Sequence, residues 1–162
     1  MATALVEARE LLKDITPLRM DCGQVCGGAC CRSLDGERTG MLLFPGEDAF
    51  YRGRPGYEVL ETETGPLLVC DGTCERAERP LSCRLFPVLP VVRAEGVKVA
   101  MDARARAACP LAGQGVRGLS EAFVEAVRQV GQALMEDAEQ GEFLRRLTRE
   151  QDELRALQKR FG

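Results

Sequence analysis

Apolar residues recur at helical spacing in the first fifteen positions of the chain. The stripe consists of Leu5, Ala8, Leu12 and Ile15. Residues three and four apart lie on one face of an α-helix, and Pro17 cannot continue one. A helix over residues 3–15 is therefore predicted.

Two stretches in the middle of the chain have the pattern of a strand, a turn and a second strand. They are "YEVLETETGPLLVC", with a turn near Gly65, and "VLPVVRAEGVKVAMD", with a turn at Glu95-Gly96. Both favour a β-hairpin. Ahead of the first, "MLLFPGEDAFYRG" predicts a short helix that Pro45 opens and Gly53 closes.

Helical periodicity returns at Ser120, an expected N-cap, and continues to the C-terminus. The first apolar face consists of Phe123, Val127, Val130 and Leu134. Gly141 is expected to break or bend the helix. Leu147, Leu154 and Phe161 then follow at seven-residue spacing, which fits either a short coiled-coil seam or packing on the same domain. Packing on the same domain is favoured, because so few heptads are weak support for oligomers.

These elements predict a small single α+β domain over residues 1–162, long enough to bury a core. N- and C-terminal helices would pack around a cysteine-rich, loop- and hairpin-containing metal-binding middle. The cysteine-cluster region spans residues 20–110, and the C-terminal helical region spans 119–161.

Composition and charge narrow the class of protein. The chain has 45% apolar and 29% charged residues and a net charge of -3. No basic run suggests nucleic acid or an anionic membrane as a partner. The N-terminus lacks the features of a signal peptide, and no window approaches the roughly 20 apolar residues of a membrane helix. A cytoplasmic location is therefore predicted.

Eight cysteines stand out in a chain without histidine. They are Cys22, Cys26, Cys30, Cys31, Cys70, Cys74, Cys83 and Cys109. Four of them fall within "CGQVCGGACC", which raises three chemistries: disulfides, a thiolate-bound metal and a redox-active thiol pair. The reducing cytoplasm disfavours structural disulfides, so metal binding by the eight cysteines is favoured.

The spacing of the first group leaves its local structure open. Cysteines four apart share one helix face, where their thiols can converge on one metal. Gly23, Gly27 and Gly28 instead suit a loop wrapped around a cluster. For Cys109, which precedes Pro110, burial as a small hydrophobic residue is the alternative to a ligand role.

Cys30 and Cys31 are adjacent, and neighbouring side chains diverge in both helices and strands. One hypothesis is therefore a pair of centres, the first held by Cys22, Cys26 and Cys30, the second by Cys31 with the downstream cysteines. A single centre with spectator thiols is the alternative.

An all-sulfur ligand set excludes Mg²⁺ and Ca²⁺ and favours Zn²⁺ or an iron–sulfur cluster. The C-x2-C knuckles typical of structural zinc are absent, as is the bacterial ferredoxin spacing. An iron–sulfur cluster is slightly favoured over Zn²⁺.

The motifs "CGQVCGGACC" and "CDGTCERAERPLSCRLFP" together resemble the YkgJ-type cysteine-cluster family, described as a zinc- or iron-chelating domain. The similarity covers roughly residues 20 to 110 and includes Arg79-Pro80, Cys83-Arg84 and Phe86-Pro87. Ala77-Glu78 stands where the family often has an aromatic residue. The resemblance implies metal binding by these cysteines. Flagellin lysine methylases have a similar cysteine arrangement, so an enzymatic function stays an alternative.

Arg79 and Arg84 flank Cys83 and are candidate cofactor-binding residues. Their guanidinium groups could donate to cluster sulfurs and offset thiolate charge. Alternatively, they pair on the surface with Asp71, Glu75 or Glu78. The sulfur role is favoured for Arg79, because the family motif includes it, while both readings stay open for Arg84.

The predicted function is a metal-binding protein whose clustered thiolates hold an iron–sulfur cluster or zinc, with a redox or electron-transfer role. One alternative is a structural zinc protein that binds a protein partner. Another is an accessory or modifying enzyme related to the flagellin lysine methylases. No paired-carboxylate motif supports catalysis, and Asp102 with Arg104 and Arg106 is expected to form a salt-bridged surface.

Overall fold

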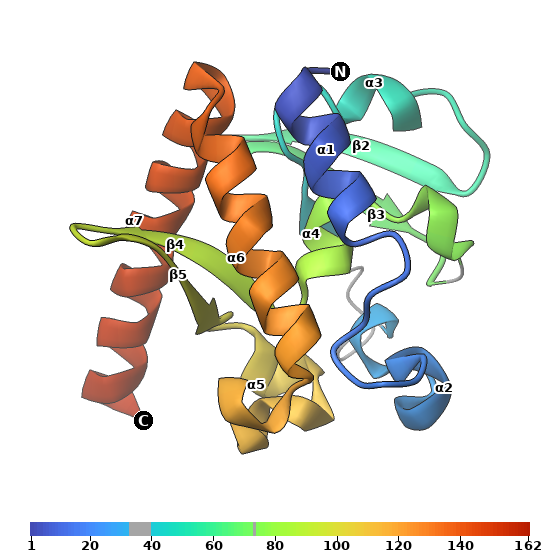
Figure 1. Ribbon diagram of the computed structural model, residues 1–162. Helices are drawn as coiled ribbons and strands as arrows, with labels where there is room; N and C mark the ends of the chain where they lie inside the picture. The colour runs from blue at the N-terminus through green and yellow to red at the C-terminus, as the bar shows by residue number, and fades with distance from the viewer. Residues whose placement is uncertain (33–39, 73) are drawn as a thin grey trace.

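Helices occupy both ends of the chain, and two small antiparallel sheets lie between them (Figure 1). The structure is a computed structural model that describes residues 1–32, 40–72 and 74–162. The α-helices are α1 (Thr3–Leu11), α2 (Cys22–Cys26), α3 (Asp48–Tyr51), α4 (Leu81–Leu85), α5 (Ala105–Ala108), α6 (Glu121–Met135) and α7 (Ala138–Phe161). The 3-10 helices are η1 (Ala29–Cys31), η2 (Arg76–Glu78), η3 (Pro110–Gln114) and η4 (Val116–Gly118). The predicted α+β class is confirmed.

Both predicted hairpins are present. The strands are β1 (Gly40–Leu42), β2 (Tyr57–Thr62), β3 (Gly65–Cys70), β4 (Val88–Arg93) and β5 (Gly96–Met101). β2 pairs with β3 from Tyr57–Cys70 to Thr62–Gly65, and β4 pairs with β5. β1 was not predicted: it has three residues and adds to the other edge of β3, giving the order β1-β3-β2.

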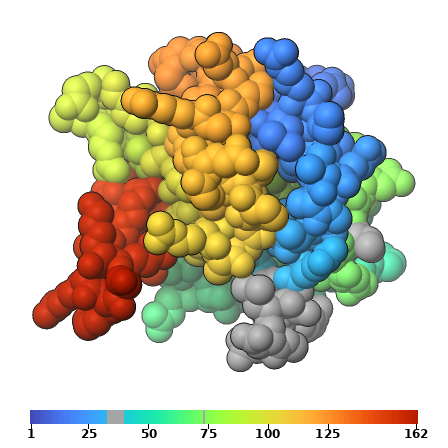
Figure 2. All heavy atoms as spheres, turned by 90° about the horizontal axis from the view of Figure 1, so that it is seen from below, coloured from blue at the N-terminus to red at the C-terminus, as the bar shows by residue number. Residues whose placement is uncertain are grey.

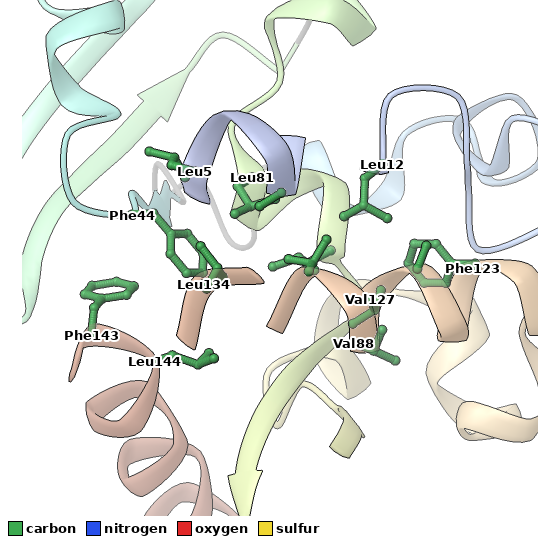
Figure 3. Packing of buried hydrophobic residues seen from close by; sticks show 14 of the residues in the cluster. Leu5, Leu12, Phe44, Leu81, Val88, Phe123, Val127, Leu134, Phe143 and Leu144 are labelled. Carbon is green, nitrogen blue, oxygen red and sulfur yellow. The ribbon is translucent and has the colours of Figure 1, made fainter. Parts of the chain in front are cut away.

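The main core lies where α1, α6, α7 and the β4–β5 hairpin meet (Figure 3). Leu5 of α1, Phe123 and Leu134 of α6, and Leu144 of α7 are fully buried there. The predicted faces of α1 and α6 therefore point into the core, whereas Leu154 and Phe161 of the predicted α7 face are exposed and only Leu147 packs against the core. The α1 helix ends at Leu11, earlier than predicted, and its C-cap Leu12 already leaves helical geometry with φ -107° and ψ 12°. Leu12 is still buried beyond the helix end.

The C-terminal helices separate before Gly141, which corrects the predicted position of the break. α6 ends at Met135 and α7 begins at Ala138. The side chain of Asp137 caps α7, where its Oδ1 accepts hydrogen bonds from the backbone N–H groups of Glu139 at 3.0 Å and Gln140 at 2.9 Å. A cap satisfies backbone donors that a new helix leaves unpaired, and it sets the start of α7.

α6 lies very close to the β4–β5 hairpin at Gly131. A Cβ atom at this position would come within 2.5 Å of both Pro90 Cβ and Val97 Cγ1. No side chain can be added there without displacing the hairpin. Gly131 therefore sets the spacing between the helix and the sheet.

The short helix after Pro45 begins at Asp48, three residues later than predicted. The reason is Glu47, whose Oε2 accepts a hydrogen bond from the N–H of Phe44 at 3.1 Å and so holds the intervening residues in a turn. Glu47 is fully buried. Its other contacts hold the helix that carries Cys83 and are described below.

Candidate metal centre

All eight cysteines line one cleft at the end of the molecule away from the N-terminus of α1. The cleft has a volume of about 1130 Å³. Figure 2 views the molecule from this side and shows the segment that contains α2, in blue, beside the segment that contains α5, in yellow. The cysteines are free thiols. The cysteines from Cys22 to Cys109 thus reach one surface, although they lie in separate groups along the sequence.

The first cysteines lie on a helical turn followed by a glycine reversal, so the helix and loop interpretations each describe part of the segment. Asp21 Oδ1 accepts a hydrogen bond from Gly23 N at 3.0 Å and caps α2. Gly27 and Gly28 then have φ angles of 63° and 69°. Side chains other than glycine rarely adopt this left-handed geometry, which explains the glycine pair and turns η1 back toward the cleft.

The loop after β3 contacts Cys31 directly. β3 ends at Cys70, and Cys74 lies shortly beyond it. Gly72 between them has a φ of 82°, and a Cβ atom there would lie 3.0 Å from the carbonyl oxygen of Cys31. The backbone at Cys31 therefore lies close to the backbone at Gly72, which follows Cys70.

Helix α4 carries Cys83 and is held in place by Glu47. Glu47 Oε1 accepts a hydrogen bond from Leu81 N, at the start of α4, at 2.9 Å. The same oxygen forms an ion pair with Arg9 Nη1 of α1 at 2.6 Å. Sequence reasoning missed Glu47, because a lone glutamate in a turn gives no sign that it will be buried. The role of Glu47 becomes clear only in the folded structure, where α1 and α4 both contact its side chain.

One group of thiols forms around α2 and Cys109. Burial raises the pKa of Cys22, and the nearby Cys26, Asp21 and Cys109 raise it further. Burial also raises the pKa of Cys109, which has Cys26 among its charged neighbours. Cys109 follows α5 and is half-buried. Its position on the cleft beside Cys22 and Cys26 supports the ligand role over that of a simple core residue.

A second group of thiols forms around Cys83. Burial raises the pKa of Cys83, and Cys31, Cys74 and Cys70 add to the rise. Burial likewise raises the pKa of Cys74, with Cys31 and Cys70 again among the groups that raise it. Thiolates repel one another, so these mutual effects reflect sulfurs that share one region of the cleft. This group consists of Cys31, Cys70, Cys74 and Cys83.

Cys30 and Cys31 lie between the two groups. Their Sγ atoms are 4.0 Å apart, and both residues are exposed. The hydrogen bond between the thiols raises the pKa of Cys30 and lowers that of Cys31, because the pair loses its first proton more easily than its second. Cys30 also has Cys22 and Cys83 among its charged neighbours, so it borders both groups.

The two candidate arginines have different surroundings. Burial acts to lower the pKa of Arg79, but the hydrogen bond with Cys74 and the charges of Cys74, Asp21 and Cys31 outweigh it and raise the pKa. Arg79 therefore lies beside Cys74 and Cys31, and its role toward a bound cofactor stays a prediction.

Arg84 lines the cleft, but its guanidinium donates to three backbone carbonyls: Nε to Arg79 O at 2.9 Å, Nη1 to Arg9 O at 3.0 Å and Nη2 to Ala77 O at 2.8 Å. The predicted surface pairing with Glu78 is not seen, because Glu78 pairs with Arg54. The arrangement supports a role for Arg84 in joining α1, η2 and α4. Donation from Arg84 to sulfur stays a prediction.

Positive charge surrounds the sulfurs. Among the described residues that line the cleft there is no aspartate, glutamate or lysine, although the chain as a whole is acidic. The arginines on the lining are Arg32, Arg76, Arg79, Arg84, Arg104 and Arg106. Such a lining offsets part of the negative charge of ionised thiols and favours an anionic group that they bind.

Thiols are ligands that soft metals prefer. The distances between them determine whether one ion can be bound by several of them. Within residues 1–32, 40–72 and 74–162, no three cysteine, aspartate or glutamate side chains lie close enough to hold one ion. Residues 22–31, which carry four of the sulfurs, have no buried residue in α2 or η1.

The expected ion pair between Asp102 and Arg104 is present, with its carboxylate buried and its guanidinium exposed. Asp102 Oδ2 pairs with Arg104 Nη2 at 2.6 Å, and its Oδ1 accepts a hydrogen bond from Gln151 Nε2 of α7 at 3.2 Å. Asp102 is only 5% exposed. The predicted salt-bridged surface is therefore correct for Arg104, whereas Asp102 is covered by Gln151 of α7. Its donors are all within the fold, which supports a structural role.

Comparison with family models, with curated proteins and with solved structures gives no match. In the described part of the chain, no helix combines the length and apolar character needed to cross a membrane. The function is therefore argued from the cleft and its thiols.

Proposed function

We propose that this protein binds metal through clustered cysteine thiolates, as an iron–sulfur cluster or as zinc. The observation that carries the proposal is that all eight cysteines, from three separate parts of the chain, line one cleft. Eight cysteines with unrelated packing roles would be spread over the core. Thiolate sulfur is a ligand for zinc and iron–sulfur clusters, with metal–sulfur bonds of about 2.3 Å.

Two centres account for the number of thiols. Mutual charge effects link Cys22, Cys26 and Cys109, with Cys30 at their edge, and link Cys31, Cys70, Cys74 and Cys83 as a second group. Four sulfurs complete either a tetrahedral zinc site or a cubane cluster. Cys30 and Cys31 do not diverge as the sequence led us to expect, because their Sγ atoms lie 4.0 Å apart, and this pair stands where the two groups adjoin. A single centre with spectator thiols remains the alternative for the experiment to exclude.

The arginines supply the charge that such centres need. A divalent ion with four thiolates carries two negative charges, and burying them requires compensation. Of the six arginines on the cleft, Arg104 is neutralised by Asp102, whereas Arg32, Arg76 and Arg84 donate to uncharged backbone carbonyls. Their positive charge therefore remains available to the centres.

An iron–sulfur cluster is favoured slightly, with redox sensing or electron transfer as its role in the cytoplasm. Cys30 and Cys31 are exposed, and a cluster near the surface can exchange electrons with a partner protein. The resemblance to the YkgJ-type family supports metal binding and leaves the metal open. Zinc with a purely structural role is the competing form of the same proposal.

Anaerobic purification followed by metal and acid-labile sulfide analysis tests the proposal. An iron–sulfur centre predicts iron and sulfide in equal amounts and visible absorption that dithionite bleaches. A colourless protein with stoichiometric zinc would support the structural form. A protein that retains neither metal, after reconstitution with each, would contradict metal binding altogether.

Single substitutions in the two groups test whether there are two centres. Cys26→Ser and Cys74→Ser should each remove about half of the metal bound by the unaltered protein, because each centre has its own ligands. Gln24→Ser, an exposed neighbour on α2, is the matched control and should retain all of it. If either cysteine variant lost all of the metal, or neither lost any, one shared centre would replace the two.

A further inference from the structure

The cleft extends past the thiols to a wall that metal binding does not use. We name it the α5–α7 wall and define it by Arg104, Arg106, Ala107, Leu157 and Phe161, all of which line the cleft. Leu157 is 51% exposed and Phe161 is 78% exposed. Large apolar side chains are thus open to solvent at the edge of a concave surface.

Polar contacts hold the end of α7 in this position. Gln158 Nε2 donates to Ala103 O at 2.8 Å, and Arg155 Nη2 donates to Met101 O at 2.7 Å. One turn earlier, Gln151 Oε1 accepts a hydrogen bond from Ala103 N at 2.8 Å. Three residues of one helix face are therefore bound to one short backbone segment. The apolar residues beside them are fixed against the cleft.

The wall also carries a cation without a partner. Arg104 is paired with Asp102, but Arg106 is exposed and, within the described residues, has neither a hydrogen bond nor an ion pair. No aspartate or glutamate side chain lies on the cleft lining among those residues. A guanidinium in this setting is ready to bind a carboxylate, sulfonate or phosphate.

The volume suits a small molecule. Ligand pockets typically measure about 300–1,000 Å³ and combine apolar walls with a few polar groups that fix orientation. The cleft, at about 1130 Å³, exceeds what metal ions bound by the surrounding sulfurs would fill. Space beside the α5–α7 wall therefore remains for an organic ligand.

We propose that the α5–α7 wall binds a small organic anion with an apolar body. Arg106 would take the anionic group, and Leu157 and Phe161 would contact the apolar part. This site goes beyond the proposed function and does not require the thiols to hold metal. Its position in the same cleft would place the ligand next to a metal centre.

Two fluorescent probes that differ in one charged group test the proposal. The anion is 8-anilinonaphthalene-1-sulfonate, and N-phenyl-1-naphthylamine has the same rings without the sulfonate. The folded full-length protein should bind the sulfonate at one site per chain and with higher affinity than the uncharged probe. Binding should occur with metal present and after its removal, which separates this test from that of the metal centres.

Three variants locate the site. Arg106→Gln should weaken sulfonate binding roughly tenfold or more, as expected for a lost hydrogen bond to a charged group, and leave the uncharged probe unaffected. Phe161→Ala should weaken binding of both probes. Arg149→Gln, which changes an exposed arginine of α7 away from the cleft, is the control and should change neither. All three positions are exposed, so folding is not at issue.

Equal affinity for the two probes, or sulfonate binding that Arg106→Gln leaves unchanged, would overturn the proposal. So would a dimer in solution that Phe161→Ala dissociates, because a second copy would then cover the wall.

Discussion

The packed body of the protein and its cysteine end are built in opposite ways. In the body, α1, α6 and α7 enclose a continuous core in which Leu5, Phe123 and Leu144 are fully buried (Figure 3). At the cysteine end, α2, η1, η2 and η3 contain no buried residue. Hydrophobic burial stabilises the first region, whereas the second consists of short elements joined by glycine turns.

The difference indicates what each region needs in order to fold. A body with its own core can form without metal, because burial of apolar area is the main source of its stability. Residues 22–31 bury almost nothing, so their order depends on contacts supplied by something else. Metal–thiolate bonds would provide those contacts, and binding energy would then act as local folding energy.

Metal removal should have the largest effect, confined to the cysteine end. Chelation under anaerobic, reducing conditions should make amide hydrogen exchange in residues 22–31 roughly tenfold faster or more. Exchange in α6 should hardly change and serves as the internal control. Hydrogen–deuterium exchange with mass spectrometry measures both segments in one sample. Cooperative loss of the whole fold on chelation would break the comparison and favour structural zinc.

Glu47 joins the two regions, and its substitution should cause the next largest effect. Glu47→Gln removes a buried negative charge that pairs with Arg9 and accepts from the start of α4. Breaking a buried pair leaves an uncompensated charge, so we expect a loss of about 3 kcal/mol in the free energy of unfolding. Urea denaturation measures it. The exposed Glu10→Gln should leave stability unchanged, and an equal loss there would contradict a specific role for Glu47.

Gly131 tests the packing of the body alone. Gly131→Ala should destabilise the protein by about 2 kcal/mol, because the added methyl group meets Pro90 and Val97. Gly141→Ala is the matched control in α7, where the nearest atom lies at 3.6 Å. It should be neutral or stabilising, as expected for alanine in a helix. Thermal unfolding of the two variants compares them directly, and similar behaviour would show that the α6–hairpin contact is loose.

Asp102 should produce a smaller, pH-dependent effect at the boundary between the regions. Burial acts to raise its pKa, but Arg104 and Gln151 outweigh this and lower it. A lowered folded-state pKa contributes stability that is present above the ordinary value of about 3.9 and is lost as the pH falls below it. Asp102→Asn should therefore lose about 1 kcal/mol at pH 7 and approach the unaltered protein in acid.

Chemical denaturation at several pH values measures this difference, with Asp14→Asn as an exposed control. A difference between Asp102→Asn and the unaltered protein that stays constant from neutral pH to about pH 3 would show that the carboxylate is not held ionised by Arg104.

Local patterns predicted the elements of the body well. The alternation in residues 57–70 and 88–101 specified both hairpins, and the apolar face beginning at Phe123 specified α6. Features that depend on distant partners were missed. β1 is three residues long and gains its strand geometry only by pairing with β3. The break before α7 depends on an Asp137 cap that competed with the more conspicuous Gly141.

The cysteine end was predictable in composition and less so in arrangement. The spacing of "CGQVCGGACC" indicated a chelating segment, but the α2 turn followed by Gly27 and Gly28 combines two interpretations that spacing alone left open. The position of Cys109 beside Cys22 and Cys26 depends on the path of the chain through β4, β5 and α5. The number of residues between these cysteines does not indicate the path that the chain takes between them.

X-ray absorption at the edge of the bound metal tests the central claim most directly. Protein purified or reconstituted under anaerobic conditions should show only sulfur in the first shell, at about 2.3 Å, from thiolates and any cluster sulfide. Because the chain has no histidine, nitrogen ligands are not expected. A first shell of oxygen or nitrogen would place the metal away from the cysteine cleft and contradict the account.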